Sequence, residues 1–327
     1  MRLLLAALCG IFSIFGIFGV FVAQAQPYPS RPITLVVPFA AGGPTDTLAR
    51  ILGERMRQSL GQTVVVETTT GAAGSIGVGR VARAAPDGYT VGIGHVGTHV
   101  VNGAIYPLGY DLLKDLDPVV LLPANPQLIV TKPNVPAKDL KELIGWVKEN
   151  QGKITGGTAG NGSASHVAAI YFQQKTATNY TLVPYRGTGP AILDLIAGQI
   201  DLMIDQASNS LPHVQGGKLR AFAVTAAKRL PSAPDIPSVD EAGLPGFYIS
   251  IWHGLWVPHG TPKETIERLT AAAQEALADP AVQKRLGELG LESPPRERQT
   301  PEGLRAHQIA EIEKWWPIIK AANIKGE

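Results

Sequence analysis

Two glycine-rich stretches, PFAAGGPTD at Pro38–Asp46 and GGTAGNGSASH at Gly156–His166, each follow a β-like run and lead into a helix-like segment. At such a junction the first helical N–H groups have no partner within the helix, and the helix dipole favours negative charge. Neither stretch contains Lys or Arg. The pattern therefore predicts an anion held by N–H groups and hydroxyls, and two such stretches predict a ligand gripped from two sides.

The N-terminus has the pattern of an export signal. Arg2 precedes an uncharged apolar run from Leu3 to Val22, and Ala23-Gln24-Ala25 supplies the small-x-small cleavage pattern. We expect cleavage after Ala25, so that residues 1–25 are a signal peptide; a permanent membrane anchor is the alternative, since the run is long enough to span a bilayer. Cleavage removes Cys9, the single cysteine, and the mature chain then has no disulfide or thiolate site.

Charge and length narrow the class of protein. Removal of residues 1–25 leaves 28 basic and 27 acidic residues in a chain of 302 residues. This balance gives no reason to expect a nucleic-acid partner. A chain of this length exceeds one hydrophobic core and is expected to form two domains.

Strand-like and helix-like segments alternate along most of the chain, which predicts parallel sheets with helices on both faces. The expected strands are 33–39, 63–67, 89–94, 153–156, 181–184, 200–205 and 221–225. The expected helices are 47–60, 75–84, 139–150, 165–175, 189–197, 208–215, 263–277, 281–289 and 302–322.

Two further apolar regions are interpreted as crossings between domains. The first contains the runs Val119–Leu122 and Gln127–Thr131, separated by prolines, and the second is Tyr248–Val257. Domain 1 is then discontinuous, 26–125 plus 250–327, and domain 2 is 126–249. A single large sheet is the alternative, because periodicity does not exclude it.

The two glycine-rich stretches supply the first candidate site residues. Gly42 and Gly43 allow close approach of a ligand, Thr45 offers a hydroxyl, and Asp46 is expected to be the N-cap of the following helix. The second stretch offers Asn161, Ser163, Ser165 as an N-cap, and His166. A Ser–His nucleophile pair is the alternative there, although the pattern G-x-S-x-G is absent.

Other candidate motifs have weaker support. Gly92–Gly97 matches G-x-G-x-x-G, but Pro107 and Gly109 interrupt the segment after it, so we expect no dinucleotide there and assign His95 and Thr98 to the cleft lining. The seven histidines form no zinc-binding helix motif, and we expect no metal. Arg186 is either a partner for a distal carboxylate or a surface arginine. Asp205 is either a cleft acceptor or the cap of the next helix.

With these residues identified, the chain closely resembles the Bug family, the solute-binding proteins of tripartite tricarboxylate transporters. The matching stretches follow the family order across almost the whole mature chain. They are YPSRPITLVVPFAAGGPTDTLAR, APDGYT, GTAGNGSASH, VPYRGTGPA, the Asp201–Asp205 strand end, GKLRAFAVTAAKR and VDEAGLPGF. The resemblance implies a type II-like periplasmic binding protein with two α/β domains, each a mainly parallel sheet flanked by helices, joined by crossing strands.

The resemblance also implies site residues and partners. The family's two carboxylate-gripping loops fall on Phe39–Asp46 and on Thr158–His166, which adds Phe39, Thr158, Ala159 and Gly162 to the site. Thr68-Thr69-Thr70 departs from the family's more usual Asn-Arg-Pro, so the distal part of the ligand is less well defined. The expected function is capture of a di- or tricarboxylate, acidic amino acid or aromatic acid in the periplasm. We expect a monomer without cofactor or catalytic residues that delivers its ligand to the large and small subunits of a membrane permease. A periplasmic sensor and a hydrolase are the alternatives.

Overall fold

The computed structural model describes residues 28–321 and residue 324. The predicted signal peptide, residues 1–25, and Cys9 lie outside the described residues. Within that described part, no helix combines the length and the apolar character needed to cross a membrane.

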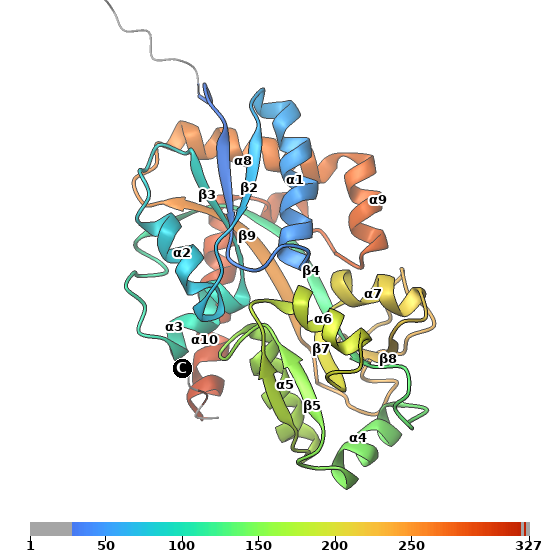
Figure 1. Ribbon diagram of the computed structural model, residues 1–327. Coiled ribbons are helices and arrows are strands. Elements are labelled where there is room, and N and C mark those ends of the chain that lie inside the picture. Colours follow the sequence, from blue (N-terminus) through green and yellow to red (C-terminus); the bar gives the residue numbers. More distant parts are fainter. Residues whose placement is uncertain (1–27, 322–323, 325–327) are drawn as a thin grey trace, which may run out of the picture.

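Nine strands form one curled sheet in the order β2-β1-β3-β9-β4-β7-β5-β6, and β8 pairs with β4 (Figure 1). The strands are β1 (Ile33–Val37), β2 (Val64–Thr68), β3 (Thr90–His95), β4 (Leu116–Thr131), β5 (Thr155–Thr158), β6 (Thr181–Pro184), β7 (Leu202–Gln206), β8 (Arg220–Val224) and β9 (Ser250–Pro258).

The helices fill the segments between the strands and the C-terminal part of the chain. They are α1 (Pro44–Leu60), η1 (Ala72–Gly74), α2 (Ser75–Ala82), η2 (Gly97–Val101), α3 (Asn102–Ile105), α4 (Leu140–Glu149), α5 (Ala164–Thr176), α6 (Thr188–Ile196), α7 (Ala207–Gln215), α8 (Lys263–Ala278), α9 (Pro280–Glu288), η3 (Arg296–Arg298) and α10 (Pro301–Ala321).

Parallel pairing occurs where the βαβ rhythm predicts it. β1 pairs in parallel with β2 and β3, and β5 pairs in parallel with β6 and β7. Because a parallel pair needs a crossover, helices such as α1 and α5 connect these strands and cover the sheet. The α/β fold class predicted from the sequence is confirmed.

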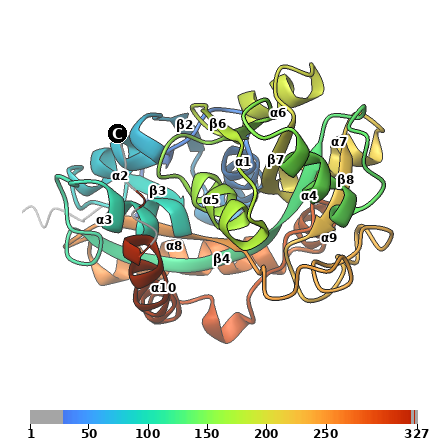
Figure 2. The same cartoon turned by 90° about the horizontal axis from the view of Figure 1, so that it is seen from below.

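β4 and β9 add antiparallel pairing at the centre, so the sheet as a whole is mixed. The two strands pair with each other from Leu116↔Pro258 to Pro126↔Ser250 and run in opposite directions between the two halves (Figure 1). In Figure 2 the long band of β4 extends across the molecule. The predicted apolar runs Val119–Leu122 and Gln127–Thr131 are therefore parts of one strand. Register shifts at Pro118/Val120 and Leu122/Ala124 accommodate prolines, which have no N–H to donate to the ladder.

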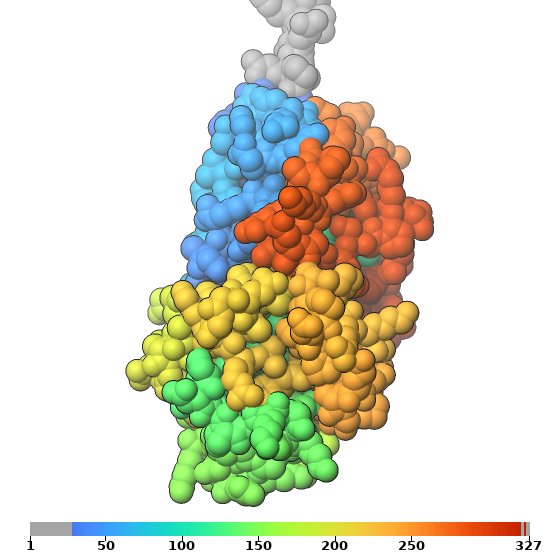
Figure 3. Space-filling model, turned by 90° about the vertical axis from the view of Figure 1, so that its right-hand side faces the viewer, coloured from blue at the N-terminus to red at the C-terminus, as the bar shows by residue number. Residues whose placement is uncertain are grey.

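The molecule is elongated, with two halves that differ in the parts of the chain that build them. In Figure 3 the upper half has the colours of the N- and C-terminal segments and the lower half those of the middle of the chain. α1, α8 and α9 bury Leu48, Leu269 and Leu286, respectively, in one core of the upper half. The predicted boundaries fall within β4 and at the first residue of β9; these boundaries stay a prediction.

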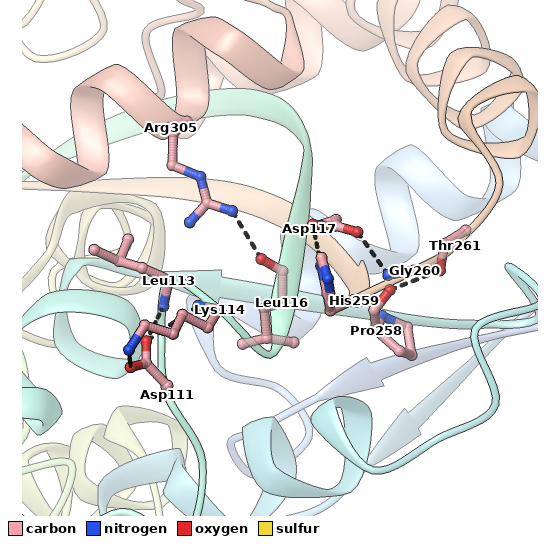
Figure 4. A network of polar contacts seen from close by, with 10 residues as sticks. All are labelled: Asp111, Leu113, Lys114, Leu116, Asp117, Pro258, His259, Gly260, Thr261 and Arg305. Atoms are coloured by element: carbon pink, nitrogen blue, oxygen red, sulfur yellow. Dashed lines mark hydrogen bonds and ion pairs between the residues drawn. The ribbon is translucent and has the colours of Figure 1, made fainter.

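A polar network fixes the outer ends of the crossing strands (Figure 4). Arg305 of α10 donates to the carbonyl of Leu116, the residue that opens β4, at 2.9 Å. Asp117 accepts from the N–H of Gly260 at 2.9 Å and contacts Nδ1 of His259 at 3.0 Å, and Thr261 closes the turn by donating to the Pro258 carbonyl. These contacts hold α10 and the turn after β9 against the start of β4.

Candidate functional site

The turns that follow β1 and β5 meet at one pocket, which we call the inner pocket. Its cavity volume is about 30 Å³, which is smaller than a typical small-molecule site, and it is partly open to solvent. Eight residues from the two predicted loops line it, together with His95 and with residues of β4, α6, β7 and β9. The lining residues are Phe39, Gly43, Pro44, Thr45, His95, Gln127, Ala159, Ser163, Ala164, Ser165, Thr188, Asp205, Gln206 and Ile251.

The first loop enters α1 earlier than the sequence indicated. Gly43 is the N-cap, and Pro44 occupies the first helical position, where its fixed φ and missing N–H are favourable. The prediction that Asp46 is the N-cap is therefore wrong, because Asp46 lies inside the first turn. Its carboxylate accepts from the Gly42 N–H and from Nε of Arg50, both at 2.9 Å. This pairing turns the Asp46 charge toward its own loop, and neither Gly42 nor Asp46 lines the inner pocket.

Thr45 is held by a residue that the sequence analysis did not assign to the site. Nδ1 of the buried His253 lies 3.1 Å from the carbonyl of Pro123, so Nδ1 carries the hydrogen. Burial lowers the pKa of His253 to about 4, which keeps the ring neutral and leaves Nε2 as an acceptor. The Thr45 hydroxyl, 3.4 Å away, therefore donates to Nε2. No short-range pattern links these residues, which lie on α1 and β9.

His95 is held in one tautomer beside the pocket. Its Nδ1 accepts from the Gly97 N–H at 2.9 Å, and its ring stacks on Phe39 with centroids 4.8 Å apart. Burial, assisted by neighbouring His253 and His99, lowers the pKa of His95 well below its ordinary value. The neutral ring consequently has Nε2–H as its donor. Thr98, predicted as a lining residue, lies instead behind His95, where its hydroxyl bonds to the His95 backbone.

In the second loop Ser163, not Ser165, is the N-cap, so that prediction is also wrong. The Ser163 hydroxyl accepts from the His166 N–H at 3.3 Å. Ser165, one residue into the helix, accepts from the Ala159 N–H at 2.8 Å and contacts the Ser163 hydroxyl at 3.1 Å. One of the two serine hydrogens makes that mutual contact, which leaves the other available to a ligand.

The Ser–His arrangement does not form a nucleophile pair. Nδ1 of His166 accepts from the Gly162 N–H at 3.2 Å, and among the described residues no hydrogen bond joins a serine hydroxyl to the His166 ring. A nucleophilic serine needs such a base within hydrogen-bonding reach. Gly162 and His166 therefore shape the loop and do not line the inner pocket.

The first turns of α1 and α5 present backbone donors toward this pocket. Within residues 28–321, four first-turn N–H groups have no hydrogen-bond partner in the protein. They belong to Thr45, Asp46, Ala164 and Ser165. Thr45, Ala164 and Ser165 belong to the pocket lining. Unpaired N–H groups at two helix N-termini form an anion-binding environment without a cationic side chain.

Asp205 lies fully buried at the end of β7 and lines the inner pocket. Burial raises the pKa of Asp205 to about 6, although hydrogen bonds from Ser210 and Asn209 favour its ionised form. The N-cap of α7 is Gln206, so the cap alternative for Asp205 is wrong. The inner-pocket residues Gln127, Thr188, Gln206 and Ile251 were missed as site residues; Thr188 lies within VPYRGTGPA and Gln206 directly follows Asp205.

A second cavity, the outer pocket, adjoins the inner one through Phe39 and Ala159, which line both. Asn161 and the exposed Arg186 line the outer pocket, and Asp205 does not. Thr158 lines neither pocket, because it is buried at the end of β5 and its hydroxyl accepts from Gly160. Within the described chain, no group of three His, Cys, Asp or Glu residues could hold a metal ion.

Contacts join the two halves beside the two pockets. The Ala40 N–H donates to the Arg186 carbonyl at 3.1 Å, and the Tyr106 hydroxyl donates to the Asn161 carbonyl. Gly189 approaches the first loop so closely that a Cβ there would lie 3.0 Å from the Gly43 nitrogen. The two loops and the N-terminus of α6 thus meet around the site.

The comparisons agree with this arrangement. Residues 48–324 match the model of the tripartite tricarboxylate transporter family receptor. The UPF0065 protein in the TAR-I ttuE-ttuC' intergenic region of Agrobacterium vitis is 42% identical over 93% of this chain and 88% of its own. BugT of Bordetella pertussis is 33% identical over 98% of both chains.

Solved structures of the same kind superpose on the chain. The periplasmic binding protein BugD has a TM-score of 0.89 at 42% identity, covering 92% of this chain and all of its own. MatC from Rhodopseudomonas palustris with bound malate has a TM-score of 0.86 at 40% identity, covering 89% of this chain and 100% of its own. Rpa4515 of R. palustris with adipate has a TM-score of 0.86 at 34% identity, covering 91% of this chain and 99% of its own.

These relatives are binding receptors and not enzymes, which agrees with the absence of a serine–histidine pair in the described loop. A matching family model over most of the chain and relatives of this identity establish the family. The chain belongs to the Bug family of tripartite tricarboxylate transporter receptors.

Proposed function

We propose that this receptor captures a small organic carboxylate in the inner pocket and delivers it to the large and small membrane subunits of a tripartite transporter. The observation that carries the proposal is the convergence of two helix N-termini on one pocket. Their free N–H groups and one serine hydrogen supply donors, and none of the described residues that line the pocket is Lys or Arg. Such a donor set favours a carboxylate over a cation or an uncharged sugar.

The proposed mechanism is capture by closure. Residues 126–249 act as one domain and residues 26–125 with 250–327 as the other, and β4 and β9 connect them. Contacts such as Ala40 N–H to Arg186 carbonyl form when the halves meet. Closure excludes water, which strengthens each hydrogen bond to the carboxylate.

Two related structures support the ligand class. MatC was solved with bound malate and Rpa4515 with adipate. We infer that the present chain also takes a carboxylate, with one carboxyl group between the loops and the remainder toward the outer pocket and Arg186. We also infer export to the periplasm with removal of residues 1–25, and function as a monomer.

A thermal-shift screen tests the proposal. Protein purified from the periplasm of an expressing host is unfolded, freed of ligand, refolded and screened with mono-, di- and tricarboxylates, acidic amino acids, aromatic acids and neutral sugars. A ligand at a hundred times its Kd adds about 2.7 kcal/mol to the free energy of unfolding. We expect stabilisation by carboxylates alone; a folded protein that responds to none of them contradicts the proposal. Loss of uptake of the same acid on deletion of the gene tests delivery.

A further inference from the structure

One wall of the inner pocket carries unpaired acceptors. Oδ2 of Asp205 accepts from Nδ2 of Asn209 at 2.7 Å and from the Ser210 hydroxyl at 2.6 Å. The other oxygen, Oδ1, is buried and has no hydrogen-bond partner in the part of the chain that the structure describes. A buried polar atom without a partner is unfavourable, and more so when it carries charge, so Oδ1 is available to a donor from a bound ligand.

Two neighbouring amides extend this wall. Gln127 of β4 pairs in register with Gln206 of β7, and both side chains line the inner pocket. Their Oε1 atoms are also buried and have no partner within residues 28–321. Three acceptor oxygens therefore lie together at the ends of β4 and β7.

This acceptor wall lies beside the donors of the second loop. β5 and β7 pair in parallel at Gly157↔Met203, and extending that register by two residues brings Ala159 next to Asp205. A carboxylate at the N-terminus of α5 is thus close to Asp205. Burial raises the pKa of Asp205 only to about 6, so near pH 7.5 the carboxyl is largely ionised and accepts hydrogen bonds.

A carboxylate without a nearby donor group pairs with the N–H donors of the pocket but not with its acceptor oxygens. It satisfies the N–H groups of α1 and α5, but it places a second negative charge near Asp205 and leaves Oδ1 unpaired. No described residue that lines the inner pocket is Lys or Arg, so no cation compensates. A ligand with a hydrogen-bond donor close to its carboxylate pairs with both the N–H groups of the helices and the acceptor Oδ1 of Asp205.

We propose, resting on the proposed function, that the ligand carries a hydroxyl or ammonium group on the carbon next to its carboxylate, and that this group donates to Asp205 Oδ1. Asp205 is then the residue that selects 2-hydroxy or 2-amino acids over unsubstituted acids. The N–H groups of the two loops bind the carboxylate, and Asp205 accepts a hydrogen bond from the hydroxyl or ammonium group beside it.

Calorimetric titration of two matched series tests this selection. One series is succinate, L-malate and L-aspartate, and the other is propionate, L-lactate and L-alanine, so that chain length and the second carboxylate are controlled. We expect the hydroxy or the amino acid to bind at least about tenfold more tightly than the unsubstituted acid in any series that binds. Equal binding within a series overturns the inference and leaves the proposed function intact. Absence of binding by all six acids, and by every carboxylate of the wider screen, overturns both.

Variants assign the selection to Asp205. Asp205→Asn keeps an acceptor oxygen and removes the charge, so the preference for the amino acid is expected to fall more than the preference for the hydroxy acid. Asp205→Glu keeps the charge and displaces the oxygen, and it serves as the second variant if the first does not fold; both preferences are then expected to fall. Asp201→Asn is the matched control, because Asp201 pairs with Lys132 just before the opposite end of β7. An unchanged ranking in a folded Asp205 variant overturns the assignment.

Discussion

The loops that open α1 and α5 play similar roles but are stabilised in different ways. In the α5 loop the contacts of Ser163 and Ser165 are local, to residues within six positions. In the α1 loop the Thr45 hydroxyl reaches His253, 208 positions away on β9. One loop is fixed by its own sequence and the other by the crossing strand behind it.

The difference changes what each hydroxyl offers to a ligand. The serine pair keeps one hydrogen free, whereas the Thr45 hydrogen is donated to His253. Two glycine-rich stretches that look alike in sequence therefore supply different donors. The α1 loop contributes backbone N–H groups, and the α5 loop contributes N–H groups and a hydroxyl.

The largest expected effect concerns the anchor of the α1 loop at low pH. The pKa of His253 is lowered from 6.5 to about 4, so between these pH values His253 is protonated in the unfolded chain and neutral in the folded chain. The corresponding stability is present above pH 6.5 and is lost as the pH falls through 4, and for His253 it amounts to about 3 kcal/mol. Urea unfolding of wild type and of His253→Gln between pH 7.5 and 4 measures this loss.

Comparison with the variant is necessary because Asp205 acts in the opposite direction. Its raised pKa of about 6 adds stability as the pH falls from 6 to 4, equally in both proteins. The wild-type stability should therefore fall more steeply than that of the variant. Parallel curves would show that His253 is not buried in its neutral form.

The next effect is on affinity at the α5 loop. Ser163→Ala removes a hydroxyl that binds the carboxylate, and we expect the Kd to rise about ten- to a hundredfold. Ser238→Ala is the matched control, because the Ser238 hydroxyl also accepts the N–H three residues ahead, from Glu241 at 3.3 Å. Both variants should lose about 1 kcal/mol of unfolding free energy. Equal affinity in the two variants would remove Ser163 from the site.

Thr45→Val should show the reverse pattern. The variant leaves Nε2 of His253 without a donor, which lowers the unfolding free energy by about 1–2 kcal/mol. Affinity should change by less than about threefold, because the Thr45 hydrogen does not reach the ligand and its N–H is retained. Thr261→Val, in the network of Figure 4, is the control for loss of a buried threonine hydroxyl. A loss of affinity as large as that of Ser163→Ala would place the Thr45 hydroxyl on the ligand.

The smallest effect tests the contact between the α1 loop and α6. A Cβ at Gly189 would lie 3.0 Å from the Gly43 nitrogen, so Gly189→Ala holds the two loops apart. We expect ligand affinity to fall about fivefold, equivalent to about 1 kcal/mol, with little change in the stability of the ligand-free protein. Gly145→Ala is the control, because a Cβ there meets nothing within 4 Å. Unchanged binding in Gly189→Ala would mean that closure does not bring these glycines together.

The sequence predicted the fold class because its signals are local. Apolar periodicity and Gly61 at the end of a helix are visible within short windows, and the elements lie within a few residues of their predicted bounds. The antiparallel centre was not predicted, since the pairing of β4 with β9 joins residues more than a hundred positions apart.

The parts of the site that lie in the two glycine-rich loops were predicted from the sequence, and the parts on the crossing strands were not. Residues of the two loops that line the pocket, such as Gly43 and Ser163, follow from the glycine-rich patterns. The exact caps did not, because Gly43 and Ser163 cap helices that begin earlier than expected. His253 and Gln127 were missed, since only the folded sheet brings crossing strands to the pocket.

The central claim is that one carboxylate is held between the N-termini of α1 and α5. A crystal structure of the protein with the acid selected by the screen tests it most directly. The account predicts that the oxygens of one carboxylate accept hydrogen bonds, directly or through one water, from first-turn N–H groups of both helices and from a serine hydroxyl of the α5 loop. A ligand whose carboxylates all lie in the outer pocket, or contact only one of the two helices, would contradict it.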